Sequence, residues 1–382
     1  MPASPKSPVV VRPRRGQAAV FAAAVLALAI APAITLAALP DEIGGDNFEG
    51  FDLTPCDAAL TSDSTVAADY AAAMDLCVTT TEGSRAPGLI GASLTRADGT
   101  EVPHASSHSI RPHYGTGTTP RRGNALALLS TGTAAGAVDT SPSFVGPQAK
   151  PGLGFNGGTS SAMPADWLAA NSGTPPHPPG CPNVAGTSAF DSVLLKLRIR
   201  VPNNAHSFSF DSSYFASDFP ELTCAAYNDY FVALLDSGFG NPLNPTDKNV
   251  AVSVAPLAGV PITVNLANAG LGLFKQCVNG ATGCQSMSAG VIGECSGTSQ
   301  LVGTGMDSTA GLTSTDTCGT VNAQVGGGTG WLTVRGNVVP GDLIELRLAI
   351  WDSGDHLYDS DVVLDNFRWA YNAVQAGAVS SP

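Results

Sequence analysis

The chain has 382 residues, of which only 13% are charged, and it contains 43 Gly, 28 Pro and a formal net charge of −13. This content of Gly and Pro excludes a helical bundle and is typical of many short strands joined by turns. The acidic balance disfavours nucleic acid and anionic membranes as partners, and it favours divalent cations or cationic partners.

Residues 1–37 have the order of a signal peptide: basic, then apolar, then small. The apolar run at 18–31 is shorter than a membrane span, and Thr35, Leu36 and Ala37 supply the residues that a signal peptidase reads. Removing 1–37 takes away four basic residues and no acidic one, so the mature charge is 14 − 31 = −17. We therefore expect an exported chain that begins near Ala38, without a transmembrane helix.

Residues 38–110 are expected to form an N-terminal extension with one short helix. Ser64 to Cys77 carries apolar residues on one face and has capping residues before it. The following stretch, 83–123, has little periodicity, and its three histidines, His104, His108 and His113, are expected to be solvated loop residues rather than metal ligands.

The rest of the chain is read as strands separated by turns. Residues 124–132 indicate a buried strand, and 140–180, rich in Gly, Pro and Ser, indicate a long surface excursion. In Val193–Val201 every second residue is a large aliphatic, the pattern of a half-buried strand. Residues 344–350 repeat this pattern, and 362–369 are expected to alternate without a break.

Eight cysteines in an exported chain predict up to four disulfides. Sequence spacing favours Cys56 with Cys77, Cys277 with Cys284 and Cys295 with Cys318, which leaves Cys181 and Cys224. These spacings do not suit a zinc site. Strands with no alternating helices predict an all-β, jelly-roll-like antiparallel sandwich over 111–370, followed by a tail at 371–382.

Carboxylates gather on the connection between the last two predicted strands. Oxygen ligands of this kind bind Ca²⁺, so we predict a calcium site from Asp352, Asp355, Asp359, Asp361 and Asp365. The alternative is a solvated loop in which the aspartates cap turns. His356, in the same loop, is read as a surface residue, with a role as a base as the alternative.

A second polar cluster supplies candidate binding residues: Asp218, Glu221, Asn228 and Asp229. Here the chain resembles the choice-of-anchor L domain of secreted bacterial proteins. The resemblance rests on Phe208-Ser209-Phe210, Phe219-Pro220-Glu221, Asn228-Asp229, Gly327 to Leu332, Trp351 to Asp355 and Leu364 to Phe367. It covers roughly 190–370, and weaker features at Leu128 to Gly132 extend it to about 110.

The resemblance implies a surface module with no catalytic residues that could be carried over. Asp218 stands where the family pattern has Glu, and residues 370–382 contain no apolar span or sorting motif. We therefore expect a secreted or cell-surface binding, adhesion or structural module with a glycan or protein partner, and a periplasmic location as the second choice. The alternative function is a secreted polysaccharide hydrolase that uses a carboxylate pair.

Overall fold

The computed structural model describes Cys56 and residues 59–147, 156–240, 243–309, 312–320 and 326–381. The chain divides into two units, Met1–Leu39 and Pro40–Pro382. The predicted signal peptide lies outside the described residues, so every structural statement below concerns the second unit.

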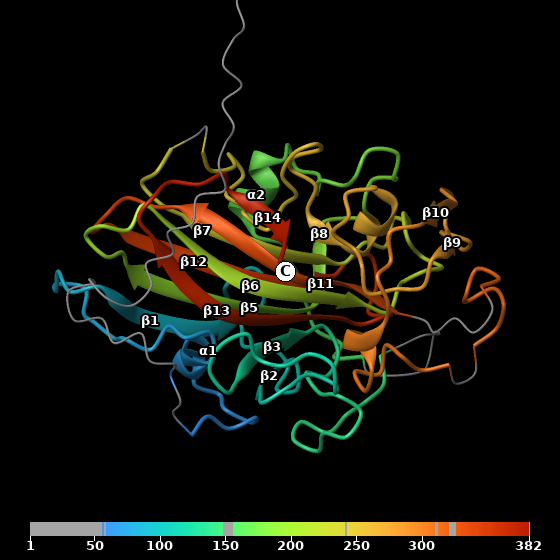
Figure 1. Cartoon of the computed structure of the whole chain (residues 1–382), viewed down its shortest axis with the longest axis horizontal. Coiled ribbons are helices and arrows are strands. Elements are labelled where there is room, and N and C mark those ends of the chain that lie inside the picture. The colour runs from blue at the N-terminus through green and yellow to red at the C-terminus, as the bar shows by residue number, and fades with distance from the viewer. Residues whose placement is uncertain are drawn as a thin grey trace, which may run out of the picture. The chain divides into compact units, whose positions relative to one another are not determined.

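Two six-stranded antiparallel sheets dominate this unit (Figure 1). The first sheet has the order β1-β5-β12-β7-β8, with β4 also paired to β5. Its strands are β1 (Gly88–Thr95), β4 (Ser160–Ala162), β5 (Ser188–Arg200), β7 (Tyr230–Asp236), β8 (Ile262–Thr263) and β12 (Leu343–Asp352).

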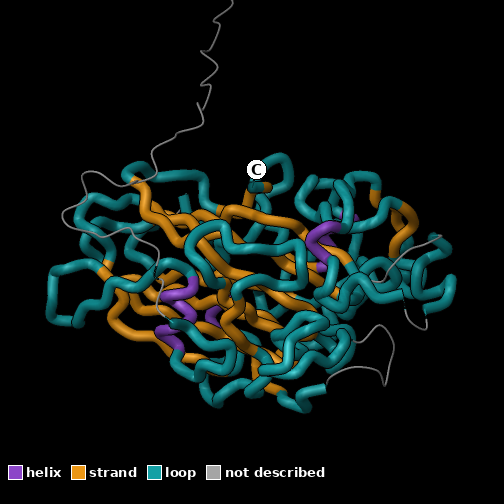
Figure 2. The backbone as a smooth tube through the Cα atoms, turned by 60° about the horizontal axis from the view of Figure 1, so that its bottom comes forward, coloured by secondary structure: helices purple, strands orange, loops and turns teal. Residues whose placement is uncertain are grey.

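The second sheet has the order β14-β11-β6-β13-β3-β2. Its strands are β2 (His108–Arg111), β3 (Leu126–Ser130), β6 (Ser207–Ala216), β11 (Gly327–Asn337), β13 (Ser360–Ala370) and β14 (Gly377–Ser380). A separate hairpin pairs β9 (Gly280–Thr282) with β10 (Gly290–Ile292). Short 3-10 turns at Val264–Asn268 and Ser299–Leu301 interrupt the long loops that surround the strands (Figure 2).

The main core lies between the two sheets and confirms the predicted alternation. Val193, Leu195, Leu197 and Ile199 of β5 and Ile344, Leu346, Leu348 and Ile350 of β12 are buried in one cluster. Lys196 and Arg198, at intervening positions of β5, carry side chains that are 42% and 44% exposed. Antiparallel sheets that share one apolar layer make the fold the all-β sandwich that the sequence predicts.

Strand β13 departs from the predicted unbroken alternation. Val362 and Leu364 enter the central core, and so does Phe367, so the inward positions change from even to odd numbers. The change occurs at a bulge between Asp365 and Arg368, where Asn366 has a φ of +57°. An extra residue in one strand shifts every later side chain to the opposite face.

The outer faces of both sheets are also partly covered. Outside β7 and β12, Trp167 of α2 (Ala165–Ala170) packs edge-on against Tyr230 and Trp351, with ring centroids 5.6 and 5.5 Å away. This helix lies in the stretch that the sequence indicates as a surface excursion. Outside β3 and β13, Tyr114, Leu301 and Met306 bury Leu128 and Val363.

The predicted N-terminal helix is present as α1 (Ala67–Ala73), which is shorter than the predicted range. Its Tyr70 hydroxyl lies 2.6 Å from Nδ1 of His108 on β2 and donates to the carbonyl of Ser64 over 2.9 Å. His108 is 8% exposed, so the expectation of a solvated histidine is wrong at this position. Residues 88–111 thus contribute β1 and β2 to the two sheets.

Four disulfides join all eight cysteines, as expected, but two of the predicted pairings are wrong. The observed pairs are Cys56–Cys77, Cys181–Cys224, Cys277–Cys295 and Cys284–Cys318. The backbone N–H of Cys277 donates to the carbonyl of Gly297 over 2.9 Å, which brings Cys277 beside Cys295 instead of Cys284. Sequence proximity fails here because the β9–β10 hairpin lies between Cys277 and Cys295 and leaves Cys284 in its connecting loop.

Within the described ranges, neither helix has the length and apolar character of a membrane span.

Candidate functional site

The two polar clusters meet at one end of the sandwich. The connection between β6 and β7 begins after Ala216 and ends before Tyr230, and the connection between β12 and β13 lies between Asp352 and Ser360. Ala216 pairs with Ser360 in one sheet, and Tyr230 pairs with Trp351 in the other. Both connections therefore cross between the two sheets at the same end of the sandwich, which brings their acidic residues together.

Asp229 is the centre of the resulting hydrogen-bond network. Its Oδ1 accepts the backbone N–H of Ser353 over 3.1 Å, and its Oδ2 accepts the hydroxyl of Ser360 over 2.8 Å. Asp218 lies close to it, since the pKa of Asp218 is raised first by burial and then by the charge of Asp229. In the opposite connection, the carbonyl of Asp359 accepts both the N–H and the hydroxyl of Ser217, over 3.1 and 3.0 Å.

Asp218, Asp229, Asp352 and Asp359, which we call the carboxylate cluster, are each at most 3% exposed. Burial raises the pKa of all four carboxyls, because an ionised carboxylate loses solvation there. The charges of their acidic neighbours raise the pKa values of Asp218, Asp352 and Asp359 further. Among the described residues no Lys, Arg or His forms an ion pair with any of the four.

Several buried oxygens in the cluster have no hydrogen-bond partner among the described atoms: Oδ2 of Asp218, Oδ2 of Asp359 and both carboxylate oxygens of Asp352. Gly132 packs directly against Asp359, since a Cβ placed on it would lie 2.2 Å from Oδ2. A buried acceptor without a donor costs free energy. The cluster therefore needs either bound protons or an added cation to be stable.

The predicted calcium ligands do not all converge. Asp352 and Asp359 belong to the carboxylate cluster, whereas Asp361 accepts the hydroxyl of Tyr114 over 2.5 Å, and burial raises its pKa to about 6. Asp355 is only half-buried and accepts the N–H of Leu357 over 3.0 Å.

Asp365 lies apart from the others. It is four residues along β13 from Asp361, which places their Cα atoms about 13 Å apart. It accepts the backbone N–H groups of Arg121 and Arg122 over 2.5 and 3.2 Å. Burial is the main reason that its pKa rises to about 7.

The four predicted binding residues, Asp218, Glu221, Asn228 and Asp229, are all at most 2% exposed. Their side chains are therefore inside the sandwich end and do not form an open surface. The negative charge of Glu221 acts on Tyr358, whose pKa is raised first by burial and then by this charge.

One paired acid was not among the predicted site residues. Asp191 of β5 accepts the N–H of Thr159 over 2.7 Å and lies 2.8 Å from Nδ1 of His356, whose ring packs 4.6 Å from that of Phe190. The His356 side chain is 26% exposed, so it is partly covered rather than a free surface histidine. The partners are 165 residues apart in the chain, and local spacing carries no signal for such a pair.

No three His, Cys, Asp or Glu side chains in the described ranges are already arranged to hold one metal ion. Two hollows lie elsewhere: one of about 270 Å³ bordered by Asp75, Arg111 and Arg122, and an open one of about 440 Å³ bordered by Arg198 and Glu345. Neither is lined by the carboxylate cluster, so neither provides a route for a substrate to reach it.

Comparison with known proteins gives one match. Residues 183–367 match the choice-of-anchor L domain family. No curated protein and no solved structure shows significant similarity to the chain. The matched range contains β5, both acidic connections and most of β13, so it includes the whole carboxylate cluster. This assignment and the four disulfides are consistent with a surface or extracellular protein. Residues 183–367 therefore match the choice-of-anchor L domain family, and this match indicates a surface-associated module.

Proposed function

We propose that the chain is an exported β-sandwich module that acts at the cell surface or outside the cell by binding a glycan or protein or by forming structure. The family match and the four disulfides support this location, since disulfides persist in oxidising compartments. The basic, apolar and small order of residues 1–37 supports export.

The geometry of the carboxylates favours a structural role over hydrolysis. A glycosidase needs two carboxyl groups about 5–9 Å apart on either side of the scissile bond. Asp218 and Asp229 instead lie together in the buried carboxylate cluster, and both are 2% exposed. A substrate has no space between these two groups, so the hydrolase alternative receives no support from them.

We further propose that Ca²⁺ stabilises the module at the carboxylate cluster. The observation that carries this proposal is the burial of four carboxyls, supplied by two connections, without a basic partner among the described residues. Carboxylate oxygens are preferred calcium ligands. Binding would require the carboxylates to turn towards a common point, and it would join the β6–β7 connection to the β12–β13 connection.

Thermal unfolding in calcium and in EGTA tests the stabilisation. Extracellular modules bind Ca²⁺ with dissociation constants of about 0.1–1 mM. At about 1 mM free Ca²⁺ and a constant near 0.1 mM, binding adds about 1.4 kcal/mol to the free energy of unfolding, a shift of a few degrees for a domain of this size. An unchanged melting temperature in EGTA would contradict calcium stabilisation, whereas the surface assignment would stand.

Export is tested separately. The full chain, expressed in a bacterial host that secretes proteins, should be found outside the cytoplasm with a mature N-terminus near Ala38. Protein recovered only from the cytoplasm, with Met1 intact, would contradict the proposed location.

A further inference from the structure

The Cys284–Cys318 disulfide joins two segments next to the acidic β6–β7 connection. Gly283 and Gln285, the neighbours of Cys284, donate their backbone N–H groups to the carbonyls of Pro220 and Glu221 over 2.8 and 2.9 Å. The turn that carries Cys284 therefore lies directly on the segment that leads into the carboxylate cluster.

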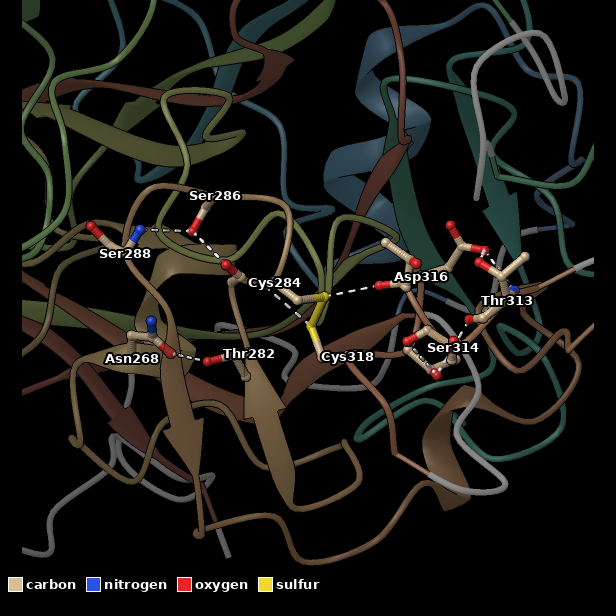
Figure 3. The surroundings of a disulfide bond; sticks show 12 residues. Asn268, Thr282, Cys284, Ser286, Ser288, Thr313, Ser314, Asp316 and Cys318 are labelled. Carbon is tan, nitrogen blue, oxygen red and sulfur yellow. Dashed lines mark hydrogen bonds between the residues drawn. A yellow bond between two sulfur atoms is a disulfide. The ribbon is translucent and has the colours of Figure 1, made fainter.

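Residues 312–320, the partner segment, form a compact turn stabilised by many bonds of its own. Asp316 Oδ2 accepts the N–H and the hydroxyl of Thr313 over 2.6 and 2.7 Å, and Gly319 donates to the carbonyl of Ser314 over 2.7 Å. Figure 3 shows this turn beside the disulfide, with Asp316 and Thr313 together. Such local bonds keep the turn folded but do not fasten it to the sandwich.

This turn contacts the hairpin at Cys284 and also at Gly280, where an added Cβ would lie 2.6 Å from Thr320 Oγ1. Besides the covalent bond to Cys318, the N–H of Cys284 donates to Cys318 Sγ over 3.3 Å, and Cys284 Sγ lies 2.9 Å from the carbonyl oxygen of Thr315 (Figure 3). Opening the disulfide would therefore remove the covalent bond and the contacts that depend on it.

The turn also lies close to the β12–β13 connection. Asp316 and Tyr358 are each 7% exposed, and the charge of Asp316 contributes to raising the pKa of Tyr358, after burial and the charges of Glu221 and Asp218. Tyr358 immediately precedes Asp359 of the carboxylate cluster. Residues 312–320 thus lie within electrostatic range of Tyr358 in the β12–β13 connection, and the disulfide joins them to the turn that contacts the β6–β7 connection.

Access to the sulfur atoms differs among the disulfides. Cys284 is exposed and Cys318 is half-buried, whereas Cys181 and Cys224 are only 8% and 4% exposed and Cys277 is 2% exposed. Exchange requires a thiolate to reach a disulfide sulfur. Cys77 is also exposed and Cys295 is half-buried, so an external thiol can approach Cys77 and Cys284 in the folded protein but not the buried Cys181–Cys224 bond.

We propose that Cys284–Cys318 is a reducible clasp that fastens residues 312–320 against the acidic connections and releases them in the presence of a dithiol. One thiolate of the dithiol attacks Cys284 Sγ, the S–S bond breaks, and Cys318 leaves as a thiolate. The second thiol of the reagent then displaces Cys284, so the protein gains two electrons and two protons and the dithiol becomes a disulfide.

The test uses the folded mature chain treated with graded dithiothreitol, then trapped with N-ethylmaleimide and mapped by mass spectrometry. Cys284 and Cys318 should be alkylated while Cys181 and Cys224 remain protected. Alkylation of the buried cysteines at the same or a lower reductant concentration would overturn the proposal, because it would mean that reduction follows general unfolding.

A second measurement tests whether the Cys284–Cys318 bond holds residues 312–320 in place. Amide hydrogen exchange is compared between the wild type and a Cys284→Ser/Cys318→Ser variant, with Cys56→Ser/Cys77→Ser as the matched control. Exchange across 312–320 and at Tyr358 should become about tenfold faster or more in the first variant only. Unchanged exchange there in a variant that still folds, or an equal increase in the control, would overturn the proposal.

Discussion

His108 provides a direct test of how the N-terminal helix is attached to the sandwich. Its imidazole is 8% exposed and lies beside the Tyr70 ring, with centroids 5.4 Å apart. Burial, and to a lesser degree the charge of His104, lowers the pKa of His108 to about 4. The folded protein therefore keeps this side chain neutral at pH values where the unfolded chain protonates it.

The sign and size of the effect follow from linkage. The unfolded chain, with a histidine pKa of about 6.5, binds a proton that the folded state excludes until about pH 4, so stability is lost as the pH falls through this window. At pH 5 the loss is about 2 kcal/mol relative to neutral pH, and below pH 4 it reaches about 3 kcal/mol.

Urea unfolding of the wild type and of His108→Gln at pH 7 and pH 5 measures the contribution of His108 to the free energy of unfolding. Acidification also stabilises the folded protein through the carboxyls whose pKa values are raised. These carboxyls are the same in the wild type and in His108→Gln, so their effect cancels when the two proteins are compared. The wild type should lose about 2 kcal/mol more than His108→Gln, while the control His113→Gln should behave like the wild type. Equal losses in the wild type and His108→Gln would refute a buried neutral His108.

The remaining predictions concern packing and surface charge. Trp167→Ala should lower the free energy of unfolding by about 3–5 kcal/mol in urea titrations, because Trp167 is fully buried against Tyr230 and Trp351; a loss below about 1 kcal/mol would contradict this packing. Gly132→Ala should cost about 1–3 kcal/mol, since its Cβ would collide with Asp359, whereas Gly83→Ala, with no atom within 4 Å, should have little effect. Arg347→Ala removes a double hydrogen bond to Asp166 and should cost only about 0.2–1 kcal/mol, less at high salt; a large loss that salt does not change would contradict a partly exposed ion pair.

Strand patterns were the part of the fold that could be predicted. The alternation of Val193–Val201 and of 344–350 depends only on local period, and both strands bury the expected face. The bulge at Asn366 was missed because its φ of +57° is imposed by pairing with β6. The six-residue helix α2 was also missed, since its stability comes from the packing of Trp167 rather than from a helical pattern.

The two acidic segments of the candidate site could each be predicted from the sequence, but their contact could not. Each acidic segment is visible as a run of carboxylates, but their contact depends on the pairing of Ala216 with Ser360 and of Tyr230 with Trp351. Burial could not be read from composition either, because runs of Asp usually indicate solvated turns. For the same reason Asp365 was grouped with the others, although its place on β13 separates it from them.

Isothermal titration of Ca²⁺ into the metal-free mature protein tests whether the carboxylate cluster binds calcium, with Asp352→Asn and Asp365→Asn as a matched pair. Both substitutions remove one buried carboxylate, but only Asp352 belongs to the carboxylate cluster. We expect saturable binding by the wild type and by Asp365→Asn, with a dissociation constant of about 0.1–1 mM, and at least about tenfold weaker binding by Asp352→Asn. Wild-type affinity in Asp352→Asn, or no binding by the wild type, would contradict a calcium site in the carboxylate cluster.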